Sequence, residues 1–203
     1  LKKENIDAFI SDLVAKITKS SMSGEFKHLA SVVLKNLIEN PAADSENSET
    51  KISLSTIDLI CKNVFLIISI CDPVDHSLDI LTILMRRKYF SSEDLDDFVS
   101  KIKNETEEPS PDIEKLSNSL FVVFENFDIE HYGVKLISKL MDIASSLVEK
   151  CTLEKSSRSL LKILECLEHY YCLKSLNDFD SDYNAQPFYK AIEKSFESFK
   201  ALN

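Results

Sequence analysis

Residues 133–151 read GVKLISKLMDIASSLVEKC and carry the most regular pattern in the chain. Their apolar side chains recur at intervals of three and four residues, which places them on one face of an α-helix. The members of this stripe are Gly133, Leu136, Ile137, Leu140, Met141, Ala144, Leu147, Val148 and Cys151. The pattern predicts a single helix over about residues 130–150.

The same period recurs along almost the whole chain and predicts about nine helices. Pro41 is a typical stop signal, and Ser91 followed by Asp94 is a typical capping signal at a helix start. The other expected helices cover about residues 4–20, 24–39, 54–71, 78–88, 112–126 and 153–175, with one beginning at Ser91 and one built on Phe188, Ile192, Phe196 and Phe199.

Glycine is scarce, and its scarcity narrows the fold class. Only Gly24 and Gly133 occur in 203 residues, where average usage of about 7% would give about fourteen. Glycine-rich loops that bind phosphate are therefore absent, because no G-x-G pair exists. Tight hairpins of β-sheets use the same residue. The sequence thus predicts an all-α protein.

The expected helices pair into antiparallel hairpins that start near residues 4, 53, 91 and 130. Starts roughly 40 to 50 residues apart match the length of a two-helix repeat unit. In this spacing the chain resembles HEAT and armadillo repeats, which implies an α-solenoid. An irregular helical bundle accounts for the same helices and stays open as the alternative.

Domain organisation follows from length and from two polar stretches. A chain of 203 residues fits one all-helical domain, residues 1–203. Because it begins without an initiator Met, we expect it to be part of a larger protein. Residues 41–51 and 104–112 are rich in Asp, Glu, Ser, Asn or Pro, and we expect both to be flexible acidic loops.

Composition excludes several classes of partner. The chain holds 34 acidic and 24 basic residues, giving a formal net charge of -10, which disfavours nucleic acid. The longest apolar run, Val64–Ile68, is too short to span a membrane. Five cysteines without a C-x-x-C pair indicate small core residues in a reducing, intracellular compartment, either cytoplasmic or nuclear.

Metal-binding and catalytic patterns are weak. Asp178, Asp180 and Asp182 alternate as in the opening of a calcium loop, but Tyr183 stands where that loop needs glycine. The four histidines are scattered singly, so a two-histidine zinc face is missing. We therefore predict no metal, no cofactor and no enzymatic activity.

Three groups of residues are candidates for contact with a partner. A basic triplet follows a helix, two polar residues interrupt the most apolar helix, and a tyrosine cluster lies toward the C-terminus. Each group also has a purely structural interpretation. The basic triplet would complement the helix dipole, the lysine of the apolar helix would pair with an acid, and the aromatic rings would pack in the core. The candidates are Arg86, Arg87 and Lys88; Lys62 and Asn63; and Tyr170, Tyr171, Tyr183 and Tyr189.

The function predicted from these patterns is that of a scaffold or protein-interaction module. It would bind a partner protein or peptide in a groove between helices or over the C-terminal aromatic surface. The alternative is a helical enzyme, or a bundle with an apolar cavity for a lipid or small molecule. The sequence does not indicate the oligomeric state.

Overall fold

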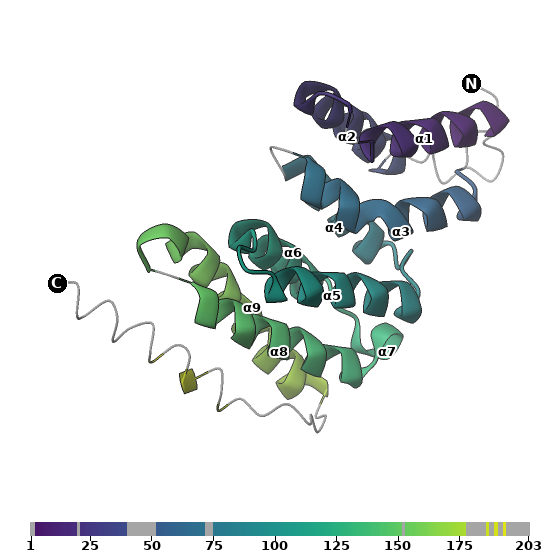
Figure 1. Cartoon of the computed structure of the whole chain (residues 1–203). Coiled ribbons are helices and arrows are strands. Elements are labelled where there is room, and N and C mark those ends of the chain that lie inside the picture. The colour runs from purple at the N-terminus through teal and green to yellow at the C-terminus, as the bar shows by residue number, and fades with distance from the viewer. Residues whose placement is uncertain are drawn as a thin grey trace. The chain divides into compact units, whose positions relative to one another are not determined.

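The computed structural model of the chain describes residues 3–19, 21–39, 52–71, 75–151 and 153–177, and positions 186, 189, 190 and 193. Within these residues every regular element is a helix and none is a strand (Figure 1). The predicted all-α fold is confirmed. The chain divides into two compact units, Leu1–Asp94 and Leu95–Asn203. A single domain over the whole chain stays a prediction.

The described residues of the first unit form four full helices. They are α1 (Lys3–Ile17), α2 (Gly24–Glu39), α3 (Leu54–Ile70) and α4 (Asp75–Arg86). Each coincides with a predicted helix to within a few residues. α1 packs against α2 and α3 against α4, while α1–α3 and α2–α4 contacts join these two hairpins.

α3 carries the most apolar stretch of the first unit, and hydrogen bonds fix its start. The Thr56 N–H donates to the Ser53 hydroxyl at 3.2 Å, which caps the helix. The Ser53 N–H donates to the Asp7 carboxylate of α1 at 3.0 Å. The start of α3 is thereby attached to the neighbouring helix.

The second unit contains the remaining helices of the described chain. They are α5 (Ser92–Glu107), whose first turn precedes the unit boundary, α6 (Ile113–Glu125), α7 (Ile129–Tyr132), α8 (Val134–Lys150) and α9 (Leu153–Asn177). The predicted cap of α5 is confirmed, since the Asp94 N–H donates to the Ser91 hydroxyl at 3.0 Å. That hydroxyl donates in turn to the Asp94 carboxylate at 2.6 Å.

The helix predicted over residues 130–150 is wrong at one point, because Gly133 divides it into α7 and α8. Gly133 has φ 82° and ψ 156°, a conformation that side-chain-bearing residues rarely adopt. The Gly133 N–H closes α7 by donating to the Ile129 carbonyl at 2.9 Å. The apolar period did not show the break, since Gly133 falls on the stripe itself.

The loop predicted over residues 104–112 is too long. α5 continues through Glu107, and its last turn buries Thr106, which is 1% exposed. The Thr106 hydroxyl donates to the Ile102 carbonyl at 2.8 Å, so burial leaves it satisfied. The predicted loop 41–51 and nearly all of the predicted helix around residues 188–199 lie outside the described residues.

Within the second unit, α6 and α9 form the most extensive helix pair. Small buried residues on both helices accompany this packing. Ser117 on α6 and Ser159 on α9 are buried, and the Ser117 hydroxyl donates to the Ile113 carbonyl of its own helix at 2.7 Å. α8 packs against both α6 and α9.

The cysteines follow the sequence expectation in part. Cys61, Cys71 and Cys166 are buried, and Cys151 is half-buried. Cys172, near the end of α9, is exposed, so the expectation of a core residue is wrong at that position. Among the described residues, no helix combines the length and the apolar character needed to cross a bilayer.

Candidate functional site

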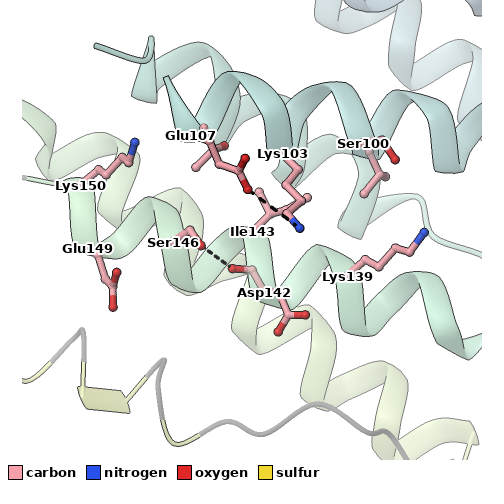
Figure 2. Close-up of a pocket in the computed structure, with 11 residues that line it drawn as sticks. Ser100, Lys103, Glu107, Lys139, Asp142, Ile143, Ser146, Glu149 and Lys150 are labelled. Carbon is pink, nitrogen blue, oxygen red and sulfur yellow. Dashed lines mark hydrogen bonds and ion pairs between the residues drawn. The ribbon is translucent and has the colours of Figure 1, made fainter. Parts of the chain in front are cut away.

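A groove of about 490 Å³ lies between α5 and α8 in the second unit (Figure 2). α5 lines it with Val99, Ser100, Lys103, Thr106 and Glu107. α8 lines it with Lys139, Asp142, Ile143, Ser146, Glu149 and Lys150. It is open rather than closed, because most of these side chains are exposed to solvent.

Helical periodicity brings the polar residues of the groove together. On α8, Lys139, Asp142, Ser146 and Glu149 are separated by three, four and three residues, so they share one face. This face borders the apolar stripe that packs into the core. α8 therefore buries its apolar stripe in the core and presents the adjacent polar face to the groove.

The floor of the groove is apolar and rigidly held. Val99 on α5 is 1% exposed and Ile143 on α8 is 2% exposed, so both also belong to the core of the unit. One ion pair and one hydrogen bond connect α8 to α5 and to the residue that follows α5, one at each end of the groove. Lys139 pairs with the Asp96 carboxylate of α5, and Lys150 donates to the Glu108 carbonyl at 3.0 Å.

Each lysine of the groove has a partner inside the unit, whereas two carboxylates have no cation partner among the described residues. Lys103 lies 4.0 Å from Glu107 on its own helix. Among the described residues, neither Asp142 nor Glu149 has a cation within ion-pairing distance. In Figure 2 these two side chains extend to the same side of α8. The groove therefore has one rim with unpaired negative charge.

The environment of Asp142 changes the ionisation of its carboxyl group. Partial burial raises the pKa of the Asp142 carboxyl above its ordinary value, and the nearby Lys103 amine opposes the shift. The Lys103 amine therefore compensates for this burial only in part.

The chemistry of the buried thiols is unfavourable for nucleophilic catalysis. Burial raises the pKa of Cys61 to about 12 and that of Cys151 to about 11. It also raises the pKa of Cys166. Reactive cysteines need the opposite shift, which gives thiolate at neutral pH. In the part of the chain that the structure describes, no three His, Cys, Asp or Glu side chains converge as metal ligands would.

Lys62 and Asn63 are polar residues within the apolar sequence of α3, and both form hydrogen bonds within that helix. The Lys62 amine is exposed and pairs with the Asp58 carboxylate one turn earlier at 2.7 Å. The Asn63 amide donates to the Leu59 carbonyl at 2.8 Å. Of the two explanations offered by the sequence, an acid that meets the lysine is the one observed.

The basic triplet lies at the C-terminal end of α4. Arg86, Arg87 and Lys88 are all exposed. The Arg87 guanidinium donates to the Glu39 carbonyl at the end of α2, at 2.8 Å, so it satisfies a free helix-end acceptor. Lys88 has φ 54° and terminates the helix in the left-handed region. Arg87 therefore has a structural role within the first unit.

The tyrosine cluster divides between core and surface. Tyr170 is 2% exposed and packs in the core, which is the alternative that the sequence left open. Tyr171 is 40% exposed, and its hydroxyl forms a hydrogen bond with the hydroxyl of Tyr189. Tyr183 lies outside the described residues. Of the described tyrosines of the cluster, Tyr171 and Tyr189 are exposed and Tyr170 is not.

Sequence reasoning missed two arrangements. His28 of α2 and His76 of α4 were interpreted as scattered, yet their rings lie 5.2 Å apart, and the Nδ1 atoms of both are buried without a hydrogen bond. The second is the groove itself. The polar spacing along α8 was visible in the sequence, but the distance between α5 and α8 depends on tertiary packing.

Comparisons of the chain with family models, with curated proteins and with solved structures found no match.

Proposed function

We propose that the chain is a non-catalytic interaction module that binds a segment of a partner protein in the groove between α5 and α8. The single observation that carries the proposal is an open groove whose floor is apolar and whose α8 rim holds unpaired carboxylates. Apolar floors supply binding free energy, and a few fixed polar groups supply orientation. Both are present on rigid helices.

The helix arrangement of each unit supports a repeat-type scaffold. In the first unit, His28 meets His76, Lys35 meets Asp79 and Glu39 meets Arg87, so contacts advance in the same direction along α2 and α4. Those two helices therefore run parallel, as equivalent helices of successive hairpins do in HEAT and armadillo solenoids.

The second unit repeats this relation. Asp96 meets Lys139 and Glu108 meets Lys150, so α5 and α8 also run parallel. We propose a HEAT- or armadillo-like α-solenoid on these grounds. Solenoids of this kind bind partners along an extended surface formed by successive repeats.

Charge and cysteine content support an intracellular protein partner. A net charge of -10 opposes binding to phosphate backbones, and the free thiols fit a reducing compartment. The alternative of an enzyme or lipid-binding bundle requires a closed apolar cavity. The α5–α8 groove is instead open and bordered by charges, which favours a polypeptide.

Site-specific photo-crosslinking tests the proposed function. A photoreactive phenylalanine analogue replaces Ser100 or Ser146, whose side chains line the groove and are exposed, in the full-length protein inside its own cells. We expect both positions to crosslink to the same polypeptide, because one bound segment would contact both helices.

The control places the same crosslinker at Glu114 or Glu125, which are exposed on α6 and do not line the groove. Neither control position should capture that polypeptide. Equal capture from α6 and from the groove, or no capture from either groove position, would show that the groove is not the binding surface.

A further inference from the structure

The polar residues of the α5–α8 groove differ in how far their charges are compensated. Each of the three lysines has a partner within the unit: Lys139 has Asp96, Lys150 has the Glu108 carbonyl, and Lys103 has Glu107. Asp142 and Glu149 have none among the described residues. An incoming acidic segment would have to displace existing bonds, whereas a basic segment would not.

The two unpaired carboxylates have a defined spacing. Seven residues of helix separate Asp142 from Glu149, and a rise of about 1.5 Å per residue puts their Cα atoms about 10 Å apart along α8. Residues seven apart on a second helix have the same separation and also share one face. Two cations at positions i and i+7 of a helix would therefore meet both carboxylates.

The floor of the groove adds a second requirement. Ile143 lies one residue after Asp142, and Val99 lines the same groove from α5. A helix bearing cations at i and i+7 presents positions i+3 and i+4 between them. Apolar side chains at those two positions would reach the floor.

A helix suits this groove better than an extended peptide. Extended ligands gain affinity by hydrogen bonding to a sheet edge, and the described residues contain no strand. The backbone groups along the middle of α5 and α8 are already used within their own helices. Side-chain packing by an amphipathic helix is the mode that uses a groove between helices together with charges at helical spacing.

On the basis of the proposed function, we infer that the occupant of the groove is an amphipathic helix of a partner protein. It carries Lys or Arg at positions i and i+7, which pair with Asp142 and Glu149, and apolar residues at i+3 and i+4, which pack into the groove between α5 and α8. The net charge of -10 would accelerate the encounter with such a partner.

Two synthetic peptides test this inference by fluorescence anisotropy with the whole 203-residue chain. Each is an alanine-based helix of about 18 residues, long enough to be helical in water. One has Arg at i and i+7 and Leu at i+3 and i+4, and the other has Glu in place of Arg. We expect the Arg peptide to bind at least about tenfold more tightly, less so at high salt.

Substitutions in the groove locate the interaction. Asp142→Asn combined with Glu149→Gln should weaken binding of the Arg peptide by about tenfold, the effect of losing two modest ion pairs. The matched control is Glu114→Gln with Glu125→Gln, which removes the same charge from exposed positions on α6. The control should bind the Arg peptide nearly as the unaltered chain does.

A charge reversal distinguishes lost binding from lost folding, because it predicts a gain of binding that an unfolded variant could not show. Asp142→Lys with Glu149→Lys should reverse the preference toward the Glu peptide. No detectable binding of the Arg peptide, equal binding of the two peptides, or equal binding by the groove variant and its control would overturn the inference. If crosslinking from Ser100 and Ser146 still captured one polypeptide, the groove would be a binding site for a partner of other chemistry.

Discussion

The second unit contains two helix pairs that differ in how closely they pack. α6 and α9 are in extensive contact, with Ser117, Ser119 and Ser159 among their buried residues. α5 and α8 instead carry Lys103, Glu107 and other long charged residues along their facing edges, and a groove separates them. The distance between packed helices depends on the size of the side chains at the contact. One side of the unit is therefore closed and the other open.

The polar groups of the two pairs differ in the same way. On α6, the Ser117 hydroxyl donates to Ile113 at 2.7 Å and the Ser119 hydroxyl donates to Lys115 at 2.8 Å, so each is satisfied within its own helix. On α8, Asp142 and Glu149 have no cation partner among the described residues. The buried polar groups of the closed pair are thus satisfied, whereas the open pair keeps two carboxylates without a cation partner among the described residues.

The largest expected effect comes from one substitution made on each side. Ile163 on α9 is 0% exposed, and Ile143 on α8 is 2% exposed but borders the groove. We expect Ile163→Ala to lower the free energy of unfolding by about 3–5 kcal/mol, because it leaves a sealed cavity, and Ile143→Ala by only about 2 kcal/mol. Urea denaturation of both variants measures the difference.

The two costs differ only if the space vacated by Ile143 opens into the groove. If Ile143→Ala costs as much as Ile163→Ala, the space beside Ile143 is as closed as the core, and the contrast between the two helix pairs fails. Val33→Ala on the exposed face of α2 serves as a reference, since Val33 is 39% exposed and its truncation removes little buried area.

A second matched pair adds volume instead of removing it. Ser117→Leu places a larger side chain in the closed core, and we expect a loss of about 1–3 kcal/mol from overpacking. Ser146→Leu adds the same side chain in the groove, where its cost should stay within about 0.5 kcal/mol. Thermal or urea unfolding of the two variants checks this. Equal destabilisation would mean that the groove has no room for an apolar side chain.

The closed side of the unit was largely predictable from sequence. The apolar periods of residues 112–126 and 153–175 predicted α6 and α9 to within a few residues, because burial of a stripe leaves a direct trace in the order of residues. The open side was predictable only as two helices. Whether their edges touch depends on three-dimensional packing, to which all neighbouring helices contribute.

The candidate binding residues show the same limit. Tyr170 and Tyr171 are adjacent in sequence, yet one is buried and the other is exposed, because successive residues of a helix point about 100° apart. Arg87 was a candidate for binding a partner, and it also caps α2, so its role in binding stays a prediction. Residue type indicated which side chains are polar or aromatic, but long-range contacts determine which of them stay accessible.

The two glycines of the chain permit a test of how α8 begins. Gly133 has φ 82°, and an added Cβ would meet nothing within 4 Å, so its substitution acts through the backbone alone. We expect Gly133→Ala to cost about 1–2 kcal/mol, the lower part of the range for a residue held in a sparsely populated conformation. Gly24→Ala, which also meets nothing within 4 Å but has no positive φ, is the control and should cost less. If the two variants have equal midpoints in urea, backbone strain at Gly133 does not set the start of α8.

The smallest expected effect concerns the charge left unpaired in the open pair. Because burial raises the pKa of Asp142, the folded chain binds that proton more tightly than the unfolded chain does. The resulting stability is present below the ordinary value of 3.8 and is lost as pH rises through the raised pKa. Asp142→Asn carries no charge and avoids this loss. We expect the variant to match the unaltered chain near pH 3 and to exceed it at pH 7 by less than about 1 kcal/mol, since solvent screens the site.

Urea unfolding at both pH values measures whether Asp142→Asn raises the free energy of unfolding at pH 7, with Asp97→Asn as the control. Asp97 pairs with Lys101 at 2.7 Å, so its neutralisation removes an ion pair and should give no gain at pH 7.

A carboxylate that lowers the stability of the folded chain is expected where binding requires it, because function and stability compete at such positions. Asp142→Asn should therefore stabilise the chain while weakening its hold on the Arg peptide. A variant that gains stability and binds the peptide unchanged would show that Asp142 is not part of the binding surface.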